Sequence, residues 1–371
     1  MMNKQLSLIL NCVCKEIQLS DEQIKKAEKI YEDLSKYLQE SNTLKSKIID
    51  IFVQGSVALQ TTVKPLKKDE FDLDIVCVFE YSGEKSEYFR TLIINRLKQS
   101  SVYRELLEES SEHKRNVCLK FGNTFHVDIV PAVKYEKDIL LIPSYNKTTN
   151  LFSWKKTNPI GFRNWFFEQA KKQKYQEHFA SKDEFPQFKE YESMFPLQNV
   201  IQLIKRWRDN KNLDDIKSIL LTTIIGNGFD GEQNLFVLLK NTVDYMLKTL
   251  TSYDIRIENP SLPEECLSEK INKNPNTFNI FRAKLQNLKD KIEILQNCDL
   301  ENINKILEEV FDENVENNDK KIIKKAFDEY GKRMKNYSDE GKMRIDTKMA
   351  TISIFGKSGK KFNSGNNFYG S

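Results

Sequence analysis

Long apolar runs are missing from this sequence. Nothing in it approaches the roughly 18 consecutive apolar residues that a membrane-spanning helix requires. The apolar run from Leu6 to Val13 ends at Lys15 and Glu16 and is too short for a secretory signal peptide. We therefore expect a cytoplasmic protein without a membrane partner.

Clustered cysteines and histidines are also missing, as is a strong charge of one sign. The six cysteines form no CxxC pair and there are only three histidines, so a zinc knuckle or a disulfide framework has little support. The 58 basic and 54 acidic residues leave a net charge of +4. Such a balance does not mark a dedicated duplex-binding protein.

The length of 371 residues suits a two-lobed protein. Residues 1–160 read as a first unit of strands with flanking helices, which includes a long amphipathic helix that opens with a capping box from Ser20 to Gln23. Residues 161–345 read as mainly helical. Residues 346–371 are rich in Gly, Ser and Asn at their end, which predicts a flexible tail.

Two carboxylates share one face of a predicted strand. In the segment FDLDIV, the period of two places Asp72 and Asp74 on one face and the apolar residues on the other. Neighbouring like charges on an otherwise apolar strand are costly unless a cation compensates them. An all-oxygen site of this kind suits Mg²⁺ or Mn²⁺.

A third carboxylate, Asp128, interrupts the similar strand FHVDIV, which we predict to form a hairpin with NVCLKF. Three carboxylates on adjacent strands could hold two metal ions, with Asp128 as general base or as ligand of the ion that activates the attacking hydroxyl. His126 shares the strand parity of Asp128, but we interpret it as a hydrogen-bonded structural histidine and leave it out of the site.

A Gly-Ser pair precedes these carboxylates. Gly55 lets the backbone approach a phosphate closely, and Ser56 offers a hydroxyl and an amide to its oxygens. A lone DxD pattern is more often a solvated strand face than a metal site. The combination of strand, Gly-Ser, DxD strand and third aspartate is more specific, and it resembles the nucleotidyltransferase superfamily that includes DNA polymerase beta.

Further segments narrow the resemblance. QGSVALQTTVKPLKKDEFDLDIVCVF, HVDIVPAV, LIKRWRD, SILLTTIIG and IENPSLPEEC are similar to the bacterial cGAS/DncV-like nucleotidyltransferases, the CD-NTase family of anti-phage (CBASS) signalling systems, over roughly residues 20–270. The resemblance implies an α+β fold, with a polymerase-beta-like nucleotidyltransferase core, a mostly helical second lobe and the active site in the cleft between them.

The resemblance also implies roles for single residues. Gly55 and Ser56 would bind the triphosphate, and Lys205 and Ser218 match positions that contact nucleotide phosphates. Asp72, Asp74 and Asp128 would hold Mg²⁺. We interpret the pair Asn259 and Pro260 as a structural turn. The predicted helix that carries Lys205 also carries Arg206 and Arg208. The simpler interpretation of these two residues is that they form a solvated basic face.

The activity that this implies is synthesis of a cyclic di- or trinucleotide from ribonucleoside triphosphates, ATP and/or GTP, which activates a separate effector protein. An accessory regulator, or a ubiquitin-transfer-like enzyme acting on the C-terminal tail, is a possible further partner, and we expect a monomer. The chain lacks the cysteine and histidine cluster of the animal DNA sensor, which argues against direct activation by duplex DNA.

Two alternatives share these features. A linear oligoadenylate synthetase-like or tRNA-end nucleotidyltransferase would use the same three carboxylates. A catalytically silent nucleic-acid-binding module would keep the fold, although such a module has no reason to keep three clustered carboxylates. Base choice, linkage and ring size are not encoded in any motif of the sequence.

Overall fold

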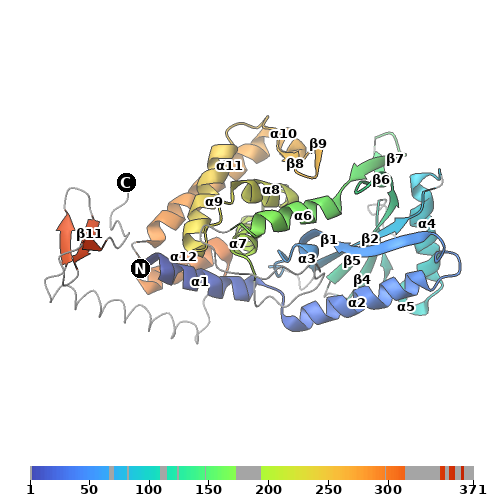
Figure 1. Ribbon diagram of the computed structural model, residues 1–371, viewed down its shortest axis with the longest axis horizontal. Helices are drawn as coiled ribbons and strands as arrows, with labels where there is room; N and C mark the ends of the chain where they lie inside the picture. The colour runs from blue at the N-terminus through green and yellow to red at the C-terminus, as the bar shows by residue number, and fades with distance from the viewer. Residues whose placement is uncertain are drawn as a thin grey trace.

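The protein has two lobes, one built on a β-sheet and one built of helices (Figure 1). The computed structural model describes residues 2–66, 71–81, 83–108, 115–122, 125–146, 148–172, 194–296, 298–313, 343–346, 351–355 and 361–362. Helix α6 (Pro159–Ala170) runs from the sheet lobe to the helical lobe. Among the described residues, no helix combines the length and apolar character that crossing a membrane would require.

Within the described residues, the sheet of the first lobe has seven strands, and β2 and β5 are its only parallel neighbours. The strand order is β1-β2-β5-β4-β3, and β6 pairs with both β5 and β7. The predicted hairpin is confirmed, since β4 and β5 pair in antiparallel fashion. The strands are β1 (Ile48–Gln54), β2 (Phe71–Phe79), β3 (Leu107–Glu108), β4 (Val117–Phe121), β5 (Phe125–Lys134), β6 (Leu140–Asn146) and β7 (Leu151–Thr157).

Helices α2 (Asp21–Gln39) and α4 (Ser86–Lys98) cover one face of this sheet. Apolar residues at every second position of β2 and β5 pack against them, because successive side chains of a strand point to opposite faces. The predicted capping box is present at Ser20. Helix α5 (Ser101–Leu106) is short and is followed directly by β3.

The helical lobe packs around α7 (Pro196–Asn210). Every residue of α7 from Leu197 to Trp207 except Asn199 is buried, which corrects the interpretation of Arg206 as part of a solvated basic face. Arg206 instead forms an ion pair with Glu313. The other long helices of this lobe are α1 (Met2–Ile17), α8 (Ser218–Gly228), α9 (Leu235–Thr249), α11 (Pro275–Leu295) and α12 (Leu300–Phe311).

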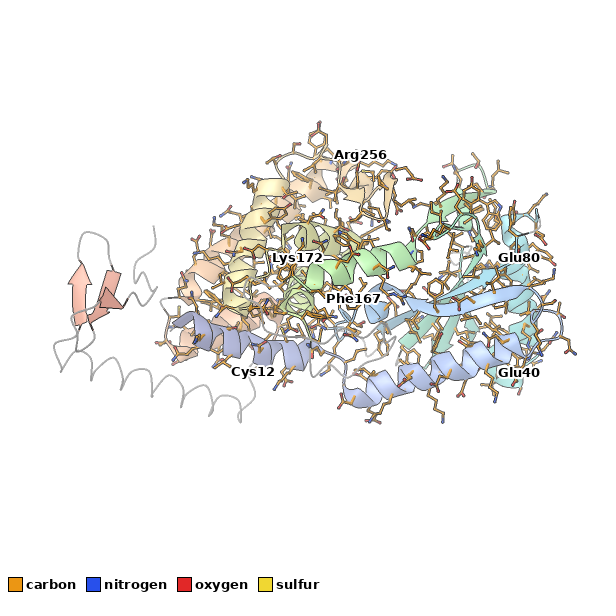
Figure 2. All side chains as sticks on the ribbon, in the orientation of Figure 1. Cys12, Glu40, Glu80, Phe167, Lys172 and Arg256 are labelled. Carbon is orange, nitrogen blue, oxygen red and sulfur yellow. The ribbon has the colours of Figure 1, made fainter. Side chains whose placement is uncertain are left out.

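Helix α1 belongs to the helical lobe rather than to the sheet lobe. Its apolar side chains pack in the same core as those of α7 and α9. Figure 2 shows Cys12 of α1 under the helices, whereas Glu40, at the end of α2, lies under the far end of the sheet. The predicted first unit, residues 1–160, therefore differs from the structure at its beginning, because the apolar face of α1 packs against helices that follow residue 160.

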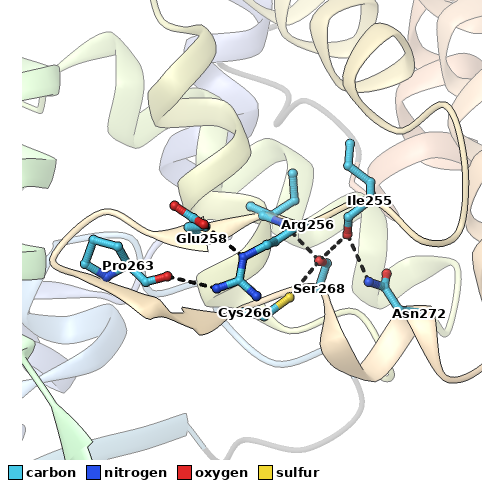
Figure 3. Close-up of polar contacts among 8 residues, drawn as sticks. Ile255, Arg256, Glu258, Pro263, Cys266, Ser268 and Asn272 are labelled. Atoms are coloured by element: carbon cyan, nitrogen blue, oxygen red, sulfur yellow. Dashed lines mark hydrogen bonds and ion pairs between the residues drawn. The ribbon is translucent and has the colours of Figure 1, made fainter.

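A short hairpin of β8 (Glu258–Asn259) and β9 (Leu262–Cys266) is fastened to the helical lobe (Figure 3). Arg256 donates hydrogen bonds to Glu258 and to the Pro263 carbonyl, at 2.9 and 3.1 Å. The Ser268 hydroxyl donates to the Ile255 carbonyl at 2.6 Å. These bonds hold the hairpin against α10 (Glu269–Asn272).

A separate antiparallel sheet near the C-terminus consists of β10 (Met343–Asp346), β11 (Thr351–Phe355) and β12 (Lys361–Phe362). Two of these strands fall inside the predicted flexible tail, residues 346–371. The β-branched and aromatic residues of TISIF favour a strand. The glycine-containing end of the tail, residues 363–371, lies outside the described residues.

Candidate active site

The three predicted carboxylates meet on the face of the sheet opposite α2 and α4. In the parallel pair of β2 and β5, Asp74 lies directly beside Asp128, and Asp72 lies beside His126. Adjacent strands are about 4.8 Å apart. The period-two pattern therefore brings Asp72, Asp74 and Asp128 together, as predicted, and the apolar residues between them point into the core.

The charges of the three aspartates favour a bound cation. Burial, together with the negative charges of Asp128 and Asp72, raises the pKa of Asp74 to about 7. Oxygen Oδ1 of Asp128 is buried and accepts no hydrogen bond from the described residues. A buried oxygen without a partner is costly, and hard divalent cations prefer carboxylate oxygens. The residues present thus fit Mg²⁺ or Mn²⁺.

Gly55 brings the backbone into contact with Asp74. It begins the short helix α3 (Gly55–Ala58), directly after β1, and has a φ of +69°. A Cβ atom at this position would lie 2.3 Å from Oδ2 of Asp74, so no other residue fits here without displacing the carboxylate. Ser56 follows on the same turn, and its hydroxyl accepts a hydrogen bond from Thr62 at 3.0 Å.

A row of polar side chains on α7 holds the loop after α3. Gln198 donates to the Leu59 carbonyl at 2.9 Å, and Gln202 donates to the Thr62 carbonyl at 3.0 Å. Lys205 donates to the carbonyl and hydroxyl oxygens of Thr61, at 3.0 and 2.9 Å. The spacing of four and three residues places all three on one side of the helix. The helical lobe therefore fixes the loop that follows Gly55 and Ser56.

Lys205 is also electrostatically linked to the carboxylates. Burial, together with the charge of Arg208, lowers the pKa of its ammonium group to about 7, whereas the charge of Asp74 opposes this shift. The lysine thus supplies a positive charge opposite Asp74 from the other lobe. Its bonds to Thr61 were not predicted from the sequence, which indicated only a phosphate contact.

A cavity of about 280 Å³ lies between the lobes and brings four of the predicted residues together. Gly55, Ser56, Lys205 and Ser218 all line it. Ser218 begins α8 and accepts a hydrogen bond from Arg208 at 2.7 Å. The three aspartates are not among the lining residues and adjoin the cavity through Gly55.

Some cavity-lining residues were not predicted from the sequence as site residues. Arg163 of α6 lines the cavity, and its Nε makes no hydrogen bond within the described part of the chain. Asn259 and Glu265 come from the β8–β9 hairpin and are joined by a hydrogen bond of 2.8 Å. Asn259 also accepts from the Ser261 amide at 3.0 Å, which agrees with the predicted structural turn.

The chain matches a family model and several known proteins. Residues 5–170 match the Second Messenger Oligonucleotide or Dinucleotide Synthetase domain. The c-di-GMP synthase of Roseivirga ehrenbergii is 28% identical over 276 residues, which cover 70% of this chain and 71% of that protein.

Solved structures support the same fold. The CD-NTase CdnG of Bradyrhizobium diazoefficiens, in complex with GTP, superposes with a TM-score of 0.70 at 19% identity, over 86% of this chain and 98% of that one. The cyclic AMP-GMP synthase DncV of Vibrio cholerae, with the linear intermediate pppA(3′,5′)pG, gives a TM-score of 0.55 at 15% identity, over 85% and 88% of the two chains. The predicted α+β fold is confirmed, and the matched domain, the c-di-GMP synthase relative and these structures together indicate a nucleotidyltransferase similar to the cGAS/DncV-like CD-NTases, as predicted.

Proposed function

We propose that this protein is a Mg²⁺-dependent enzyme that makes a cyclic di- or trinucleotide from ribonucleoside triphosphates. The observation that carries the proposal is the group of Asp72, Asp74 and Asp128 beside the cavity that Gly55 and Ser56 line. One oxygen of this group is buried and accepts no hydrogen bond from the described residues. The names of two similar proteins, a c-di-GMP synthase and a CD-NTase bound to GTP, support GTP as a substrate.

In this proposal each group has a defined task. Gly55 and Ser56 bind the triphosphate, with Lys205 and Ser218 contributing from the helical lobe, in the cavity that all four line. Asp72, Asp74 and Asp128 would hold Mg²⁺, which when bound lowers the pKa of a hydroxyl and neutralises phosphate charge. The acceptor hydroxyl attacks the α-phosphorus, its proton passes towards Asp128, and pyrophosphate leaves. A second such transfer closes a two-membered ring.

The test is incubation of the full chain with all four ribonucleoside triphosphates and Mg²⁺ or Mn²⁺, followed by phosphatase treatment and mass spectrometry. We expect a phosphatase-resistant cyclic product that contains guanine and that is absent with the Asp72→Ala/Asp74→Ala variant. A phosphatase-sensitive linear product would support the oligoadenylate synthetase-like alternative. Tight nucleic-acid binding without any product would support the silent module.

We further propose that the product activates a separate effector protein in anti-phage signalling. This rests on the family resemblance, as does the possible action of an accessory regulator or of a ubiquitin-transfer-like enzyme on the tail. Restriction of phage plating by the enzyme and its effector should disappear with the Asp72→Ala/Asp74→Ala variant. Unchanged restriction by that variant would refute the role of the product.

The Lys205→Met variant is expected to bind GTP about 10- to 100-fold more weakly. Methionine keeps the length of the side chain but removes the charge and both bonds to Thr61, and a hydrogen bond from a charged group contributes about 1.5–3 kcal/mol. Equilibrium titration with a non-hydrolysable GTP analogue measures the effect. Lys284→Met is the matched control, because Lys284 also donates to a carbonyl, that of Lys211, at 2.7 Å, away from the cavity. Equal weakening in both variants would contradict a specific role for Lys205.

Stabilisation by Mg²⁺ is expected to depend on pH through Asp74. Its carboxyl pKa is raised in the folded protein, from 3.8 to about 7, so the folded state binds the proton more tightly than the unfolded state. The associated stability is fully present below pH 4 and is lost as the pH rises through 7. Added Mg²⁺ replaces that proton. The rise in melting temperature on adding Mg²⁺ should therefore be at least about twofold larger at pH 7.5 than at pH 5.5.

Differential scanning fluorimetry with and without Mg²⁺ measures this dependence. The Asp74→Asn variant serves as its control, because asparagine has no proton to exchange with the ion. A metal-dependent shift that is the same at both pH values in the unmodified protein would contradict the prediction.

A further inference from the structure

A second group of potential metal ligands lies beside the carboxylates. Glu108, Cys118, Asp128 and Asp74 occupy one continuous row across strands β3, β4, β5 and β2, each directly opposite the next. Residues that are directly opposite in a sheet project from the same face. His126 projects from that face as well, two residues before Asp128 on β5.

The distances within this group match those of a tetrahedral site. Sγ of Cys118 lies 3.6 Å from Oε2 of Glu108 and 3.6 Å from Nδ1 of His126. Oε2 of Glu108 lies 4.0 Å from Nδ1 of His126. Zinc bonds of about 2.3 Å to sulfur and 2.0–2.1 Å to nitrogen or oxygen, at tetrahedral angles, place sulfur about 3.5 Å from the other ligands. The two sulfur distances thus need almost no adjustment, and the distance between Glu108 and His126 would have to shorten by roughly 0.7 Å.

The buried Cys118 thiol lies among several hydrogen-bonding groups. Cys118 is buried, and its side chain faces the Glu108 carboxylate, the His126 ring and the Asp128 carboxylate. A thiol has one proton and can donate it to one acceptor at a time. Two carboxylates beside one buried sulfur are an anionic setting, which favours a bound cation.

We propose that Glu108, Cys118 and His126 bind one zinc ion, separate from the Mg²⁺ of the catalytic carboxylates. Sulfur, imidazole nitrogen and carboxylate oxygen together are a ligand set that zinc accepts and that Mg²⁺ does not. The ion reaches the site from solvent, since the side chains of His126 and Glu108 are 22% and 38% exposed. The thiol proton is released to solvent as the zinc–sulfur bond forms.

This zinc ion affects catalysis by fixing the positions of side chains beside Asp128. Cys118 lies between the proposed zinc and Asp128, so fixing the sulfur atom also fixes the neighbour of a catalytic carboxylate. The three ligands are therefore positioning residues. Their binding of zinc does not depend on the proposed function, because the ligands differ from the three aspartates.

The test is titration of the full-length, chelator-treated protein with Co²⁺, which reports thiolate ligation by a charge-transfer absorption band. We expect one Co²⁺ per chain with such a band, displacement by one equivalent of Zn²⁺, and no displacement by excess Mg²⁺. Cys118→Ser should remove the band, and His126→Gln should weaken Co²⁺ binding about 100-fold or more. Asp74→Asn should keep the band, which separates this site from the catalytic carboxylates.

Cys266→Ser is the matched control, since Cys266 is a half-buried thiol whose contact is the Ser268 hydroxyl. Circular dichroism verifies that each variant is folded. His126→Gln keeps a hydrogen-bonding side chain at a partly exposed position and so provides the answer if Cys118→Ser does not fold. Absence of a thiolate band in the unmodified protein, or full Co²⁺ affinity in His126→Gln, overturns the proposal.

Discussion

Replacement of Asp74 by asparagine is expected to reduce product formation about 1,000-fold or more, while leaving the fold intact. Asn has nearly the shape of Asp but cannot supply the negative charge that a divalent cation requires. Asp74 is the central member of its group, because Asp128 lies directly beside it and Gly55 is in contact with it. Initial rates of pyrophosphate release from GTP, with saturating Mg²⁺, measure the loss.

The same substitution makes a second, opposite prediction for stability. The raised pKa of Asp74 means that its charged form is unfavourable in the metal-free protein, and asparagine resembles the neutral form. Above pH 7, the metal-free Asp74→Asn variant should therefore melt at the same temperature as the unmodified protein or higher. Asp138→Asn, at an exposed loop position, is the control and should change neither property. A variant that loses activity and stability together would contradict the assignment of Asp74 as a metal ligand.

The Gly55→Ala variant should lose more than about 100-fold in activity and should also be less stable. Two separate costs combine at this position. A non-glycine residue at a φ of +69° costs about 1–2 kcal/mol, and the added methyl group, 2.3 Å from Oδ2 of Asp74, must push that carboxylate away. Displacement of a catalytic group by about 1 Å is enough for a 100-fold loss. Steady-state kinetics and urea unfolding of the same preparation measure the two effects.

Gly122→Ala separates these two costs. Gly122 follows β4 and has a φ of +62°, and no atom of the described residues lies within 4 Å of the position that a Cβ would take. The Gly122→Ala variant has the same backbone strain, but its methyl group does not collide with a carboxylate. It should therefore lose about 1–2 kcal/mol of stability and keep its activity. If Gly55→Ala behaves like Gly122→Ala, close contact between Gly55 and Asp74 has no catalytic importance.

The sheet and its carboxylates could be predicted because their signals are local. The alternation in FDLDIV and FHVDIV fixes which side chains share a face, and a period of two leaves no other register for a half-buried strand. The Gly-Ser turn was predicted for a similar reason. Gly55 has the backbone conformation that glycine favours, and Ser56 lines the same cavity.

Features that depend on distant partners could not be predicted. Lys205 and Arg206 are buried because other helices and the loop of residues 59–62 pack around α7. From the sequence alone, a charged residue is expected to be solvated, because its partners are not known. The three proposed zinc ligands come from three strands, with spacings of ten and eight residues, and match no linear motif. Helix α1 lies beside α9, more than 200 residues later in the chain, which no local pattern indicates.

The polar row on α7 limits how the two lobes can be recombined. Gln198, Gln202 and Lys205 hold the loop of residues 59–62, and the Gln18 side chain, just after α1, donates to Gln202 at 2.9 Å. A chimera that takes its sheet lobe from one relative and its helical lobe from another therefore combines the two sides of this hydrogen-bond network from different proteins. Such a chimera should fold only when the three α7 side chains and the loop that they bind come from the same protein. For the same reason, a substitution in the three α7 side chains should be accompanied by a compensating substitution in the loop of residues 59–62.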